Sequence, residues 1–489
     1  MMTQTTEWDV VIIGAGAVAE NVADRAVQGG LTALLIESEL VGGECSYWAC
    51  MPSKALIRSG FALDAARRVG GAKQAVTGEL DVAAVLARRT SFTSNWDDAG
   101  QVEWVKGAGI ELARGHGRLS AEREVTITGS DGSTRVVTAR HAVVISTGSD
   151  PLLPNIPGLA ESAPWTPREA TSATSVPKRL GIIGGGVVAA ELATAYASLG
   201  AEVTVLARSG LLRTHEDFVG PRVAAGLRSH GVRIVEASPA NVRRSDAGVH
   251  LKLSDEELIV DEVLVATGRT PRTTDIGLDT IGLTPGEWIT VDDTLRVPGF
   301  DWLYATGDVN NRALLTHQGK YQARAAGDVI AARAHGQAVD DAPWGSHVAT
   351  ADHAAVPGVI FSDPEVAAIG LTADQARKAG YDIKVVDYEL GNVAGASLHA
   401  DDYDGAARMV VDEARGVVLG VTFVGQDVGE LIHAATIAIV GEVPLARLWH
   451  AVPAYPTMNE VWLRLLETYG RPVGVKGSGA EESAGGEGA

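Results

Sequence analysis

The two cysteines are the residues whose type and spacing most directly indicate chemistry. Cys45 and Cys50 are the only cysteines among 489 residues, and four residues separate them. Cysteine used only for packing behaves as a small core hydrophobe and would be scattered along a chain of this size. One helical turn or a tight loop would bring the pair within the Cα separation of about 5.5 Å that a disulfide needs. The pair therefore predicts a redox-active dithiol.

The residues before the first cysteine indicate an activated thiol with a ligand beside it. Gly42 and Gly43 precede Cys45 closely, and glycine lets the backbone approach a flat or anionic group. Cys45 stands where a helix would begin, and there unpaired N–H groups and the helix dipole favour a thiolate. We therefore expect Gly43 to contact a bound cofactor.

A dinucleotide-binding pattern precedes the cysteines. An apolar strand runs into the turn Gly14-Ala15-Gly16-Ala17-Val18-Ala19, a helical segment follows, and a second strand closes at Glu37. Such a turn lets a pyrophosphate approach the helix N-terminus, and the acid binds a ribose diol. The expected ligand residues are Gly14, Gly16, Ala19 and Glu37.

A second unit of the same kind indicates a second nucleotide. Its turn is Gly184-Gly185-Gly186-Val187-Val188-Ala189, so Gly184 and Gly186 repeat the role of the first glycines. At the end of its second strand, where an NAD site would carry an acid, the chain has Arg208 and then Arg213. Guanidinium groups can bind a 2′-phosphate bidentately, which favours NADPH over NADH. The alternative is that these are two surface arginines on a loop.

The cysteine motif resembles the signature of a known enzyme family. Gly-Gly-x-Cys-x4-Cys-x-Pro-Ser-Lys, residues 42–54, is similar to the active-site motif of the class I pyridine nucleotide–disulfide oxidoreductases. These FAD enzymes include dihydrolipoyl dehydrogenase, glutathione and mycothione reductases and mercuric reductase. The resemblance covers about residues 8–470, and Glu44 departs from it because that position is usually a small residue.

The resemblance implies an α/β fold with two Rossmann-like dinucleotide-binding domains and a C-terminal α+β dimerisation domain. The expected bounds are 1–157 and 287–345 for the two parts of the FAD-binding domain, 158–286 for the NAD(P)H-binding domain and 346–470 for the dimerisation domain. Residues 471–489 consist mainly of Gly, Ser, Ala and Glu and are expected to be a disordered tail.

The resemblance also implies roles for individual residues near the flavin. Cys50 would be the flavin-side thiol and Cys45 the interchange thiol, which exchanges with substrate. Lys54 and Glu191 would lie near the nicotinamide and tune the flavin. Other expected cofactor contacts are Thr147, Gly148 and Gly268, where the chain crosses between the domains, Asp308 at the ribityl chain and Thr316 at the flavin ring.

The C-terminal motif departs from the family at one residue. The family has His-Pro-Thr-x-x-Glu, in which the glutamate orients a histidine that exchanges protons with the interchange thiol. This chain has Tyr455-Pro456-Thr457-Met458-Asn459-Glu460. Neutral tyrosine donates a hydrogen bond but is a poor base, since its reference pKa is about 10. By resemblance, Tyr455 and Glu460 would act from the other subunit of a homodimer with a shared active site.

The acidic composition limits the partners. A net charge of −20 argues against nucleic acid and anionic membrane surfaces. No segment is apolar over the roughly 18 residues that a membrane span needs, and the N-terminus lacks a basic region followed by an apolar one. We expect a cytoplasmic protein, and a lone cysteine pair is more often catalytic than structural in that compartment.

Together these features predict an FAD-dependent oxidoreductase. It would pass electrons from NADPH through flavin to a Cys45–Cys50 disulfide and on to a small disulfide substrate. Because Tyr455 replaces the usual histidine, the alternative is a reductase of a non-disulfide acceptor, such as a metal ion like Hg(II) or a quinone. A flavin-binding structural or signalling protein would not need to keep the two cysteines as its only ones.

Overall fold

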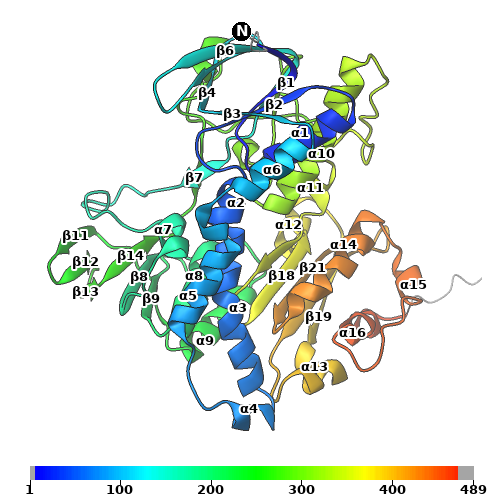
Figure 1. The fold of residues 1–489 in the computed structure, drawn as a ribbon. Coiled ribbons are helices and arrows are strands. Elements are labelled where there is room, and N and C mark those ends of the chain that lie inside the picture. Colours follow the sequence, from blue (N-terminus) through cyan, green and yellow to red (C-terminus); the bar gives the residue numbers. More distant parts are fainter. Residues whose placement is uncertain (1–5, 472–489) are drawn as a thin grey trace, which may run out of the picture.

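Three main sheets organise residues 6–471, the part of the chain that the computed structural model describes (Figure 1). The strands of the first sheet are β1 (Glu7–Ile13), β2 (Ala33–Glu37), β3 (Glu111–Arg114), β4 (His116–Ala121), β5 (Glu124–Thr128), β6 (Thr134–Ile145) and β16 (Leu303–Ala305). Their order is β3-β2-β1-β6-β5-β4, and β16 also pairs with β6. Apolar side chains are buried on both faces of this sheet, as its parallel part requires.

The register of the first sheet places the ends of its parallel strands at one edge. Ile13 of β1 lies opposite Ile36 of β2 and also opposite Ile145 of β6. The chain therefore leaves the three strands side by side, at Gly14, Glu37 and Ser146. Ligands of open α/β sheets bind at this kind of edge.

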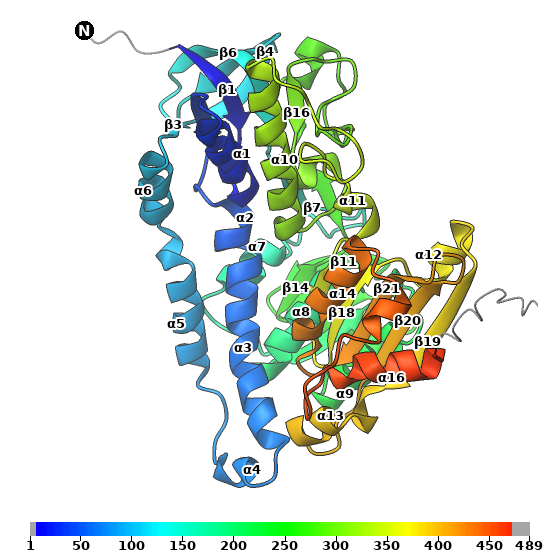
Figure 2. The same cartoon turned by 90° about the vertical axis from the view of Figure 1, so that its right-hand side faces the viewer.

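Two helices pack closely on the first sheet and reach the same edge. They are α1 (Ala17–Gln28) and α10 (Thr316–Ala334), which lie side by side in both views (Figures 1 and 2). A Cβ on Gly319 would come within 2.6 Å of Val18, so only glycine permits this approach. Arg25 of α1 donates to Asp328 of α10 over 2.7 Å. The glycine contact holds the first turns of the two helices together, and the ion pair joins the helices further along.

The cysteines lie on two successive helices. α2 (Gly43–Tyr47) contains Cys45, and α3 (Cys50–Arg67) begins with Cys50. Gly42 starts α2 from a left-handed conformation, with φ of 106°, that glycine adopts readily. The other helices of this region are α4 (Ala72–Ala75), α5 (Val82–Phe92) and α6 (Ala99–Gly107).

The second unit repeats the strand–turn–helix–strand arrangement, as predicted. Its strands are β8 (Arg179–Ile183), β9 (Glu202–Leu206), β10 (Arg233–Val235) and β14 (Glu262–Val265), and its helices are α8 (Val187–Ser198) and α9 (Val219–Ser229). The strands pair in the order β10-β9-β8-β14. A small antiparallel sheet, β11 (Asn241–Ser245), β12 (Gly248–Lys252) and β13 (Glu257–Val260), completes the unit. α8 also contacts α3, which joins the two units.

The chain crosses between the two units through a pair of short strands. β7 (Ser149–Pro151) and β15 (Arg269–Pro271) run antiparallel, so the outgoing and returning segments lie together. A short helix, α7 (Pro167–Ser172), follows the outgoing segment and leads into β8. Thr147, Gly148 and Gly268 lie at this crossing, where the sequence placed it.

The third sheet is antiparallel and belongs to the C-terminal part of the chain. Its strands are β17 (Gly358–Ile360), β18 (Glu365–Gly370), β19 (Ile383–Glu389), β20 (Ala406–Asp412) and β21 (Val417–Gly425), in the order β17-β18-β21-β20-β19. The accompanying helices are α11 (Ala351–Ala354), α12 (Ala373–Lys378), α13 (Ala394–His399), α14 (Ile432–Val440), α15 (Leu445–Leu448) and α16 (Glu460–Tyr469). α14 and α16 pack on the sheet through a single apolar core (Figure 2). Every helix within residues 6–471 is too short or too polar to cross a bilayer.

Candidate active site

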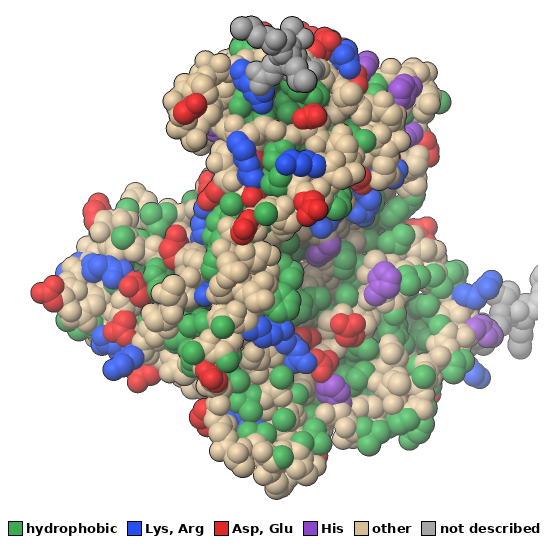
Figure 3. Space-filling model, viewed as in Figure 1, with side chains coloured by type: hydrophobic (Ala, Val, Ile, Leu, Met, Phe, Trp, Pro, Cys, Tyr) green, Lys and Arg blue, Asp and Glu red, His purple; other side chains and the backbone are tan. Residues whose placement is uncertain are grey.

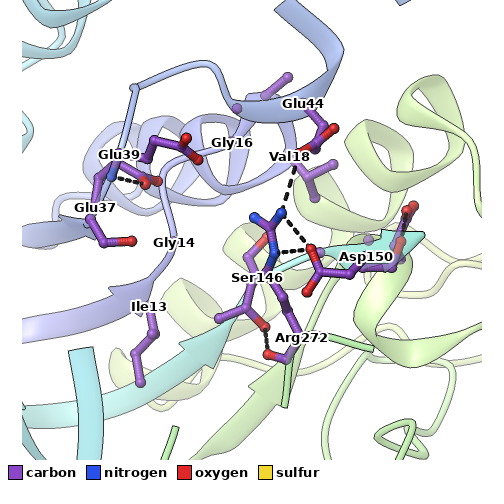
Figure 4. Close-up of a pocket in the computed structure, with 18 of the residues that line it drawn as sticks. Ile13, Gly14, Gly16, Val18, Glu37, Glu39, Glu44, Ser146, Asp150 and Arg272 are labelled. Atoms are coloured by element: carbon purple, nitrogen blue, oxygen red, sulfur yellow. Dashed lines mark hydrogen bonds and ion pairs between the residues drawn. The ribbon is translucent and has the colours of Figure 1, made fainter. Parts of the chain in front are cut away.

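A cavity of about 360 Å³ opens at the shared edge of β1, β2 and β6 (Figure 4). Most of the predicted FAD-contacting residues line it, together with Cys45, the first of the two cysteines. These are Gly14, Gly16, Glu37, Gly43, Cys45, Thr147, Gly148, Asp308 and Thr316. Ala19 is fully buried in α1, and Lys54 and Gly268 lie outside the wall of this cavity.

The glycine positions are shaped for a close ligand. Gly14 has φ of 101°, and a Cβ there would come within 2.5 Å of the Ser146 carbonyl oxygen. A Cβ on Gly16 would meet no atom of the chain, so the turn leaves open space in front of its backbone. Gly43 packs against Gly16, since its Cβ would lie 2.9 Å from the Gly16 Cα. The turn and the cysteine loop therefore form one cradle, which fits the phosphates of a dinucleotide.

Two carboxylates are fixed at the ends of the cradle. Glu37 accepts hydrogen bonds from the backbone N–H of Ala15 at 2.8 Å and of Glu39 at 2.7 Å. Asp308, in the short helix Gly307–Asn310, accepts one from the Ser149 hydroxyl at 2.6 Å. Carboxylates held this way suit the hydroxyl groups of a ribose and a ribityl chain, so the residues present fit FAD.

The two thiols lie together, and their acidities differ. Both cysteines are free, and the Cys50 sulfur lies 3.4 Å from the Thr316 hydroxyl oxygen. A hydrogen bond from Cys45 is the main cause that lowers the pKa of Cys50 to about 6, with help from Thr316 and the charge of Lys54 against the effect of burial. The same hydrogen bond, followed by burial, raises the pKa of Cys45. Cys50 is thus the thiol that ionises first.

An ion pair connects the thiol helix with the second unit. Lys54 of α3 donates to Glu191 of α8 over 2.6 Å, and the Glu191 side chain is only 6 % exposed. The other oxygen of Glu191 accepts from the backbone N–H of Phe361 at 3.1 Å, and the Lys54 ammonium lies 4.9 Å from the Phe361 ring centre. The predicted pairing of Lys54 with Glu191 is therefore present, and three parts of the chain hold it.

The second glycine turn also has the shape that a nucleotide needs. Gly184 has φ of 136°, and a Cβ there would come within 2.2 Å of the Ala266 carbonyl oxygen. Gly185 packs against the loop after β9, which carries Arg208 and Arg213. Both arginines are exposed, and within residues 6–471 neither has an ion-pair partner. Both remain available to a ligand bound at this turn.

The C-terminal pair is not assembled within one chain. Tyr455 is 77 % exposed and lies outside the cavity, and among the described residues its hydroxyl makes no hydrogen bond. Glu460, at the start of α16, is buried and accepts from the backbone N–H of Gly395 at 3.2 Å. The glutamate therefore binds the backbone and does not orient Tyr455 in this chain.

Sequence reasoning missed a set of charged residues around the cavity. Arg168 and Arg272 both line it and both contact Glu44, and Asp150 and Glu39 pair with them. The only signal in the sequence was the departure of Glu44 from the small residue usual in the motif. The arginines lie more than a hundred residues away along the chain, so no local spacing could connect them to it.

The fold and this site define a class of protein, and comparison with known proteins agrees. The family model of the pyridine nucleotide-disulphide oxidoreductases matches residues 8–332, and the model of their dimerisation domain matches residues 356–465. The chain belongs to this family. It is a flavoprotein disulfide oxidoreductase of α/β fold, as predicted, and the family implies FAD and a nicotinamide cofactor.

Individual relatives come from two branches of the family. The chain is 33% identical to a mercuric reductase of Shigella flexneri over 474 residues, covering 95% of this chain and 81% of that protein. It is 31% identical to a dihydrolipoyl dehydrogenase of Chlamydia pneumoniae over 469 residues, covering 94% and 96%. The comparisons support the disulfide reductase and do not favour the metal-ion or quinone alternative.

Solved structures show the same fold. The Cu(II) complex of the HOCl-induced flavoprotein disulfide reductase RclA from Escherichia coli superposes with a TM-score of 0.81 at 23% identity, covering 94% of this chain and 99% of that one. LpdA from Mycobacterium tuberculosis gives a TM-score of 0.78 at 24% identity, covering 95% and 99%. The match to a dimerisation domain supports the predicted homodimer.

Proposed function

We propose that this enzyme reduces a small disulfide substrate with electrons from NADPH, through FAD and the Cys45–Cys50 pair. The observation that carries the proposal is the position of the two free thiols beside the dinucleotide cavity, with one of them acidic. When bound, FAD accepts a hydride from the nicotinamide and delivers an electron pair to the disulfide. The residues of the chain manage the protons and the charges of that transfer.

The proposed division of labour between the cysteines follows from their acidities. Reduction of the disulfide by two electrons leaves two sulfurs and requires one proton if only one of them stays ionised. The low pKa of Cys50 keeps it as the thiolate, and the raised pKa of Cys45 makes it the sulfur that takes the proton. To attack a substrate disulfide, Cys45 must lose that proton again, and the leaving thiol of the substrate must gain one.

The proposed roles of Lys54 and Glu191 are electrostatic. The positive charge of Lys54 stabilises the Cys50 thiolate, and Glu191 fixes that charge in place over 2.6 Å. Because Glu191 is itself held by the Phe361 backbone, the ammonium of Lys54 can move away only by breaking its contacts with Glu191 and with the Phe361 ring. The Lys54 ammonium is therefore a positive charge held near the Cys50 thiol.

The coenzyme preference is proposed from the loop after β9. Arg208 and Arg213 are exposed there and have no ion-pair partner within residues 6–471, so they could bind a 2′-phosphate without breaking other contacts. Arg208→Ala should lower the ratio of kcat/KM for NADPH to that for NADH by about tenfold or more, the effect of one lost charge-assisted contact. A wild-type enzyme that prefers NADH would contradict the assignment.

One experiment tests the proposed function directly. The protein is reduced anaerobically with one equivalent of NADPH, treated with iodoacetamide and analysed by mass spectrometry, and its turnover with a panel of small disulfides is measured. We expect both thiols to become free on reduction, so that both Cys45 and Cys50 carry the alkyl label after treatment with iodoacetamide. A pair that stays oxidised under NADPH, with no turnover of any disulfide, would overturn the proposal.

A further inference from the structure

Five charged side chains form a connected cluster on the wall of the cofactor cavity. They are Glu39, Glu44, Asp150, Arg168 and Arg272, and all five line the cavity. They come from the loop after β2, from α2, from β7, from α7 and from the segment after β15. The cluster therefore joins the cysteine loop to both segments that cross between the two dinucleotide units.

Arg168 makes the bridge on one side. Its guanidinium donates to both oxygens of Glu39 at 2.8 Å and to Glu44 at 3.1 and 2.8 Å. It also lies 3.8 Å from the centre of the Trp48 ring, so an aromatic face supports its plane. Contacts with two carboxylates and a ring fix the side chain in one orientation.

Arg272 makes the bridge on the other side. Its Nε donates to Asp150 at 2.6 Å and its Nη2 to Glu44 at 3.2 Å, as Figure 4 shows. Both arginines thus share the same oxygen of Glu44, Oε1. Glu44 therefore links the two bridges into one continuous cluster. It stands at the position where the motif usually has a small residue.

The charge of Glu44 has a physical consequence for the cavity. A free carboxylate on the wall would repel the diphosphate of a bound dinucleotide, whereas one shared by two guanidinium groups does not. The side chains are partly exposed, with 25% for Glu44 and 45% for Glu39, so dissolved salt can weaken these contacts.

We propose that Glu39, Arg168, Glu44, Arg272 and Asp150 form an ionic latch that retains FAD in the cavity. The latch rests on the proposed function, because FAD must occupy this cavity. In this proposal the cysteine loop and the crossing segments move apart as FAD leaves, and that movement breaks the shared contacts of Glu44. The latch therefore slows cofactor loss and makes it sensitive to salt.

The test measures FAD release from the holoenzyme by the rise in flavin fluorescence after dilution, over a series of NaCl concentrations. At low salt, Arg168→Ala should release FAD about tenfold faster or more than the wild type, the effect of losing charge-assisted contacts. The wild-type rate should rise with salt toward that of the variant, and the variant should respond little. In the double variant with Glu44→Gln, the two effects should be less than additive.

Matched controls separate the latch from a general loss of stability. Arg222 bridges Glu389 and Asp404 far from the cavity, so Arg222→Ala should release FAD as slowly as the wild type. Arg272→Ala, at the other end of the latch, should behave like Arg168→Ala, and the melting temperatures of the apoproteins should agree. Release from Arg168→Ala at the wild-type rate, or fully additive effects, would overturn the latch alone. A protein that binds no FAD would overturn the proposed function together with the latch.

Discussion

The two cysteines differ in acidity because their side chains lie together. A hydrogen bond between them lowers the pKa of Cys50 to about 6 and raises that of Cys45. Lys54, one turn further along the helix of Cys50, and Thr316 of α10 stabilise the same thiolate. The motif in the sequence supplies the two cysteines. Their acidities, however, depend on contacts that the motif does not predict.

The first prediction concerns the pH dependence of the reduced enzyme. Because the pKa of Cys50 is about 6, the thiolate beside the flavin should persist above that pH and disappear as the pH falls through it. The long-wavelength absorbance of the thiolate–flavin contact measures this midpoint. Cys45→Ala removes the main stabilising hydrogen bond and should move the midpoint upward, whereas Cys45→Ser keeps a donor and should move it less. Equal midpoints in all three proteins would contradict the proposed cause.

The second prediction concerns Tyr455. A tyrosine can donate a proton but accepts one poorly at neutral pH. It can therefore protonate the leaving thiol in the thiol–disulfide exchange, but it cannot readily deprotonate the attacking thiol. Tyr455→His should raise turnover with a suitable disulfide by about tenfold or more, since an imidazole base contributes about 10²–10⁴-fold in general. Stopped-flow reduction by NADPH should change little, because Tyr455 lies outside the cavity of its own chain. Tyr455→Phe is the control, and a histidine variant that is no faster than this control would contradict the reasoning.

At the scale of elements, the sequence predicts those strands whose pattern is local. The first strand of each dinucleotide unit and the turn after it agree with the expectation, since a continuous apolar run and the glycines after it are visible along the chain. β6 differs. The residue pattern favours two separate strands, at 134–138 and 142–145, but the structure has one strand of 12 residues. The polar Arg140 lies inside it because its Nε donates to Asp9 over 2.7 Å, a contact between distant residues.

The candidate site divides in the same way. The cradle glycines, Glu37 and the cysteines could be found because each belongs to a short motif with a fixed spacing. The latch could not be predicted, because Arg168 and Arg272 reach Glu44 only in the folded chain. There, the two segments that cross between the units lie side by side. Long-range ion pairs of this kind leave no periodic trace in a single sequence.

The third prediction belongs to the first turn. Gly14→Ala would place a Cβ 2.5 Å from the Ser146 carbonyl oxygen at a φ of 101°, where non-glycine residues are strained. We expect a loss of stability of about 1–3 kcal/mol and weakened FAD binding. Thermal melts of the apoprotein and FAD titration measure the two effects. Gly132→Ala is the control, because it has φ of 79° in an exposed hairpin turn with open space around it. If both variants lose FAD affinity equally, the close approach at Gly14 is not the cause.

At the scale of the whole molecule, one face carries an apolar surface that the single chain leaves uncovered. Hydrophobic side chains gather over the region of α14 in Figure 3. Ile437 and Val440 of α14 are 59% and 40% exposed, and Val452 is 85% exposed. These residues lie within the matched dimerisation domain, so we expect the second copy of the chain to cover them.

The fourth prediction follows from this surface. Ile437→Glu would place a charge in the expected interface and should shift the dimer to monomer at micromolar concentration, because a buried unpaired charge is costly. Size-exclusion chromatography with light scattering measures the mass. Val136→Glu is the control, since Val136 is 45% exposed on β6 of the first unit. If Ile437→Glu stays dimeric, this face of α14 does not form the interface.

The position of β16 in the first sheet has a consequence for synthesis of the protein. β16, Asp308 and Thr316 complete the cofactor cavity, yet they follow the entire second unit along the chain, whose last parallel strand ends at Val265. The ribosome therefore delivers the complete second unit while the first unit still lacks β16 and α10. Since units fold as they emerge, we expect the second unit to fold first on the ribosome. The flavin would then bind to a chain whose second unit has already folded.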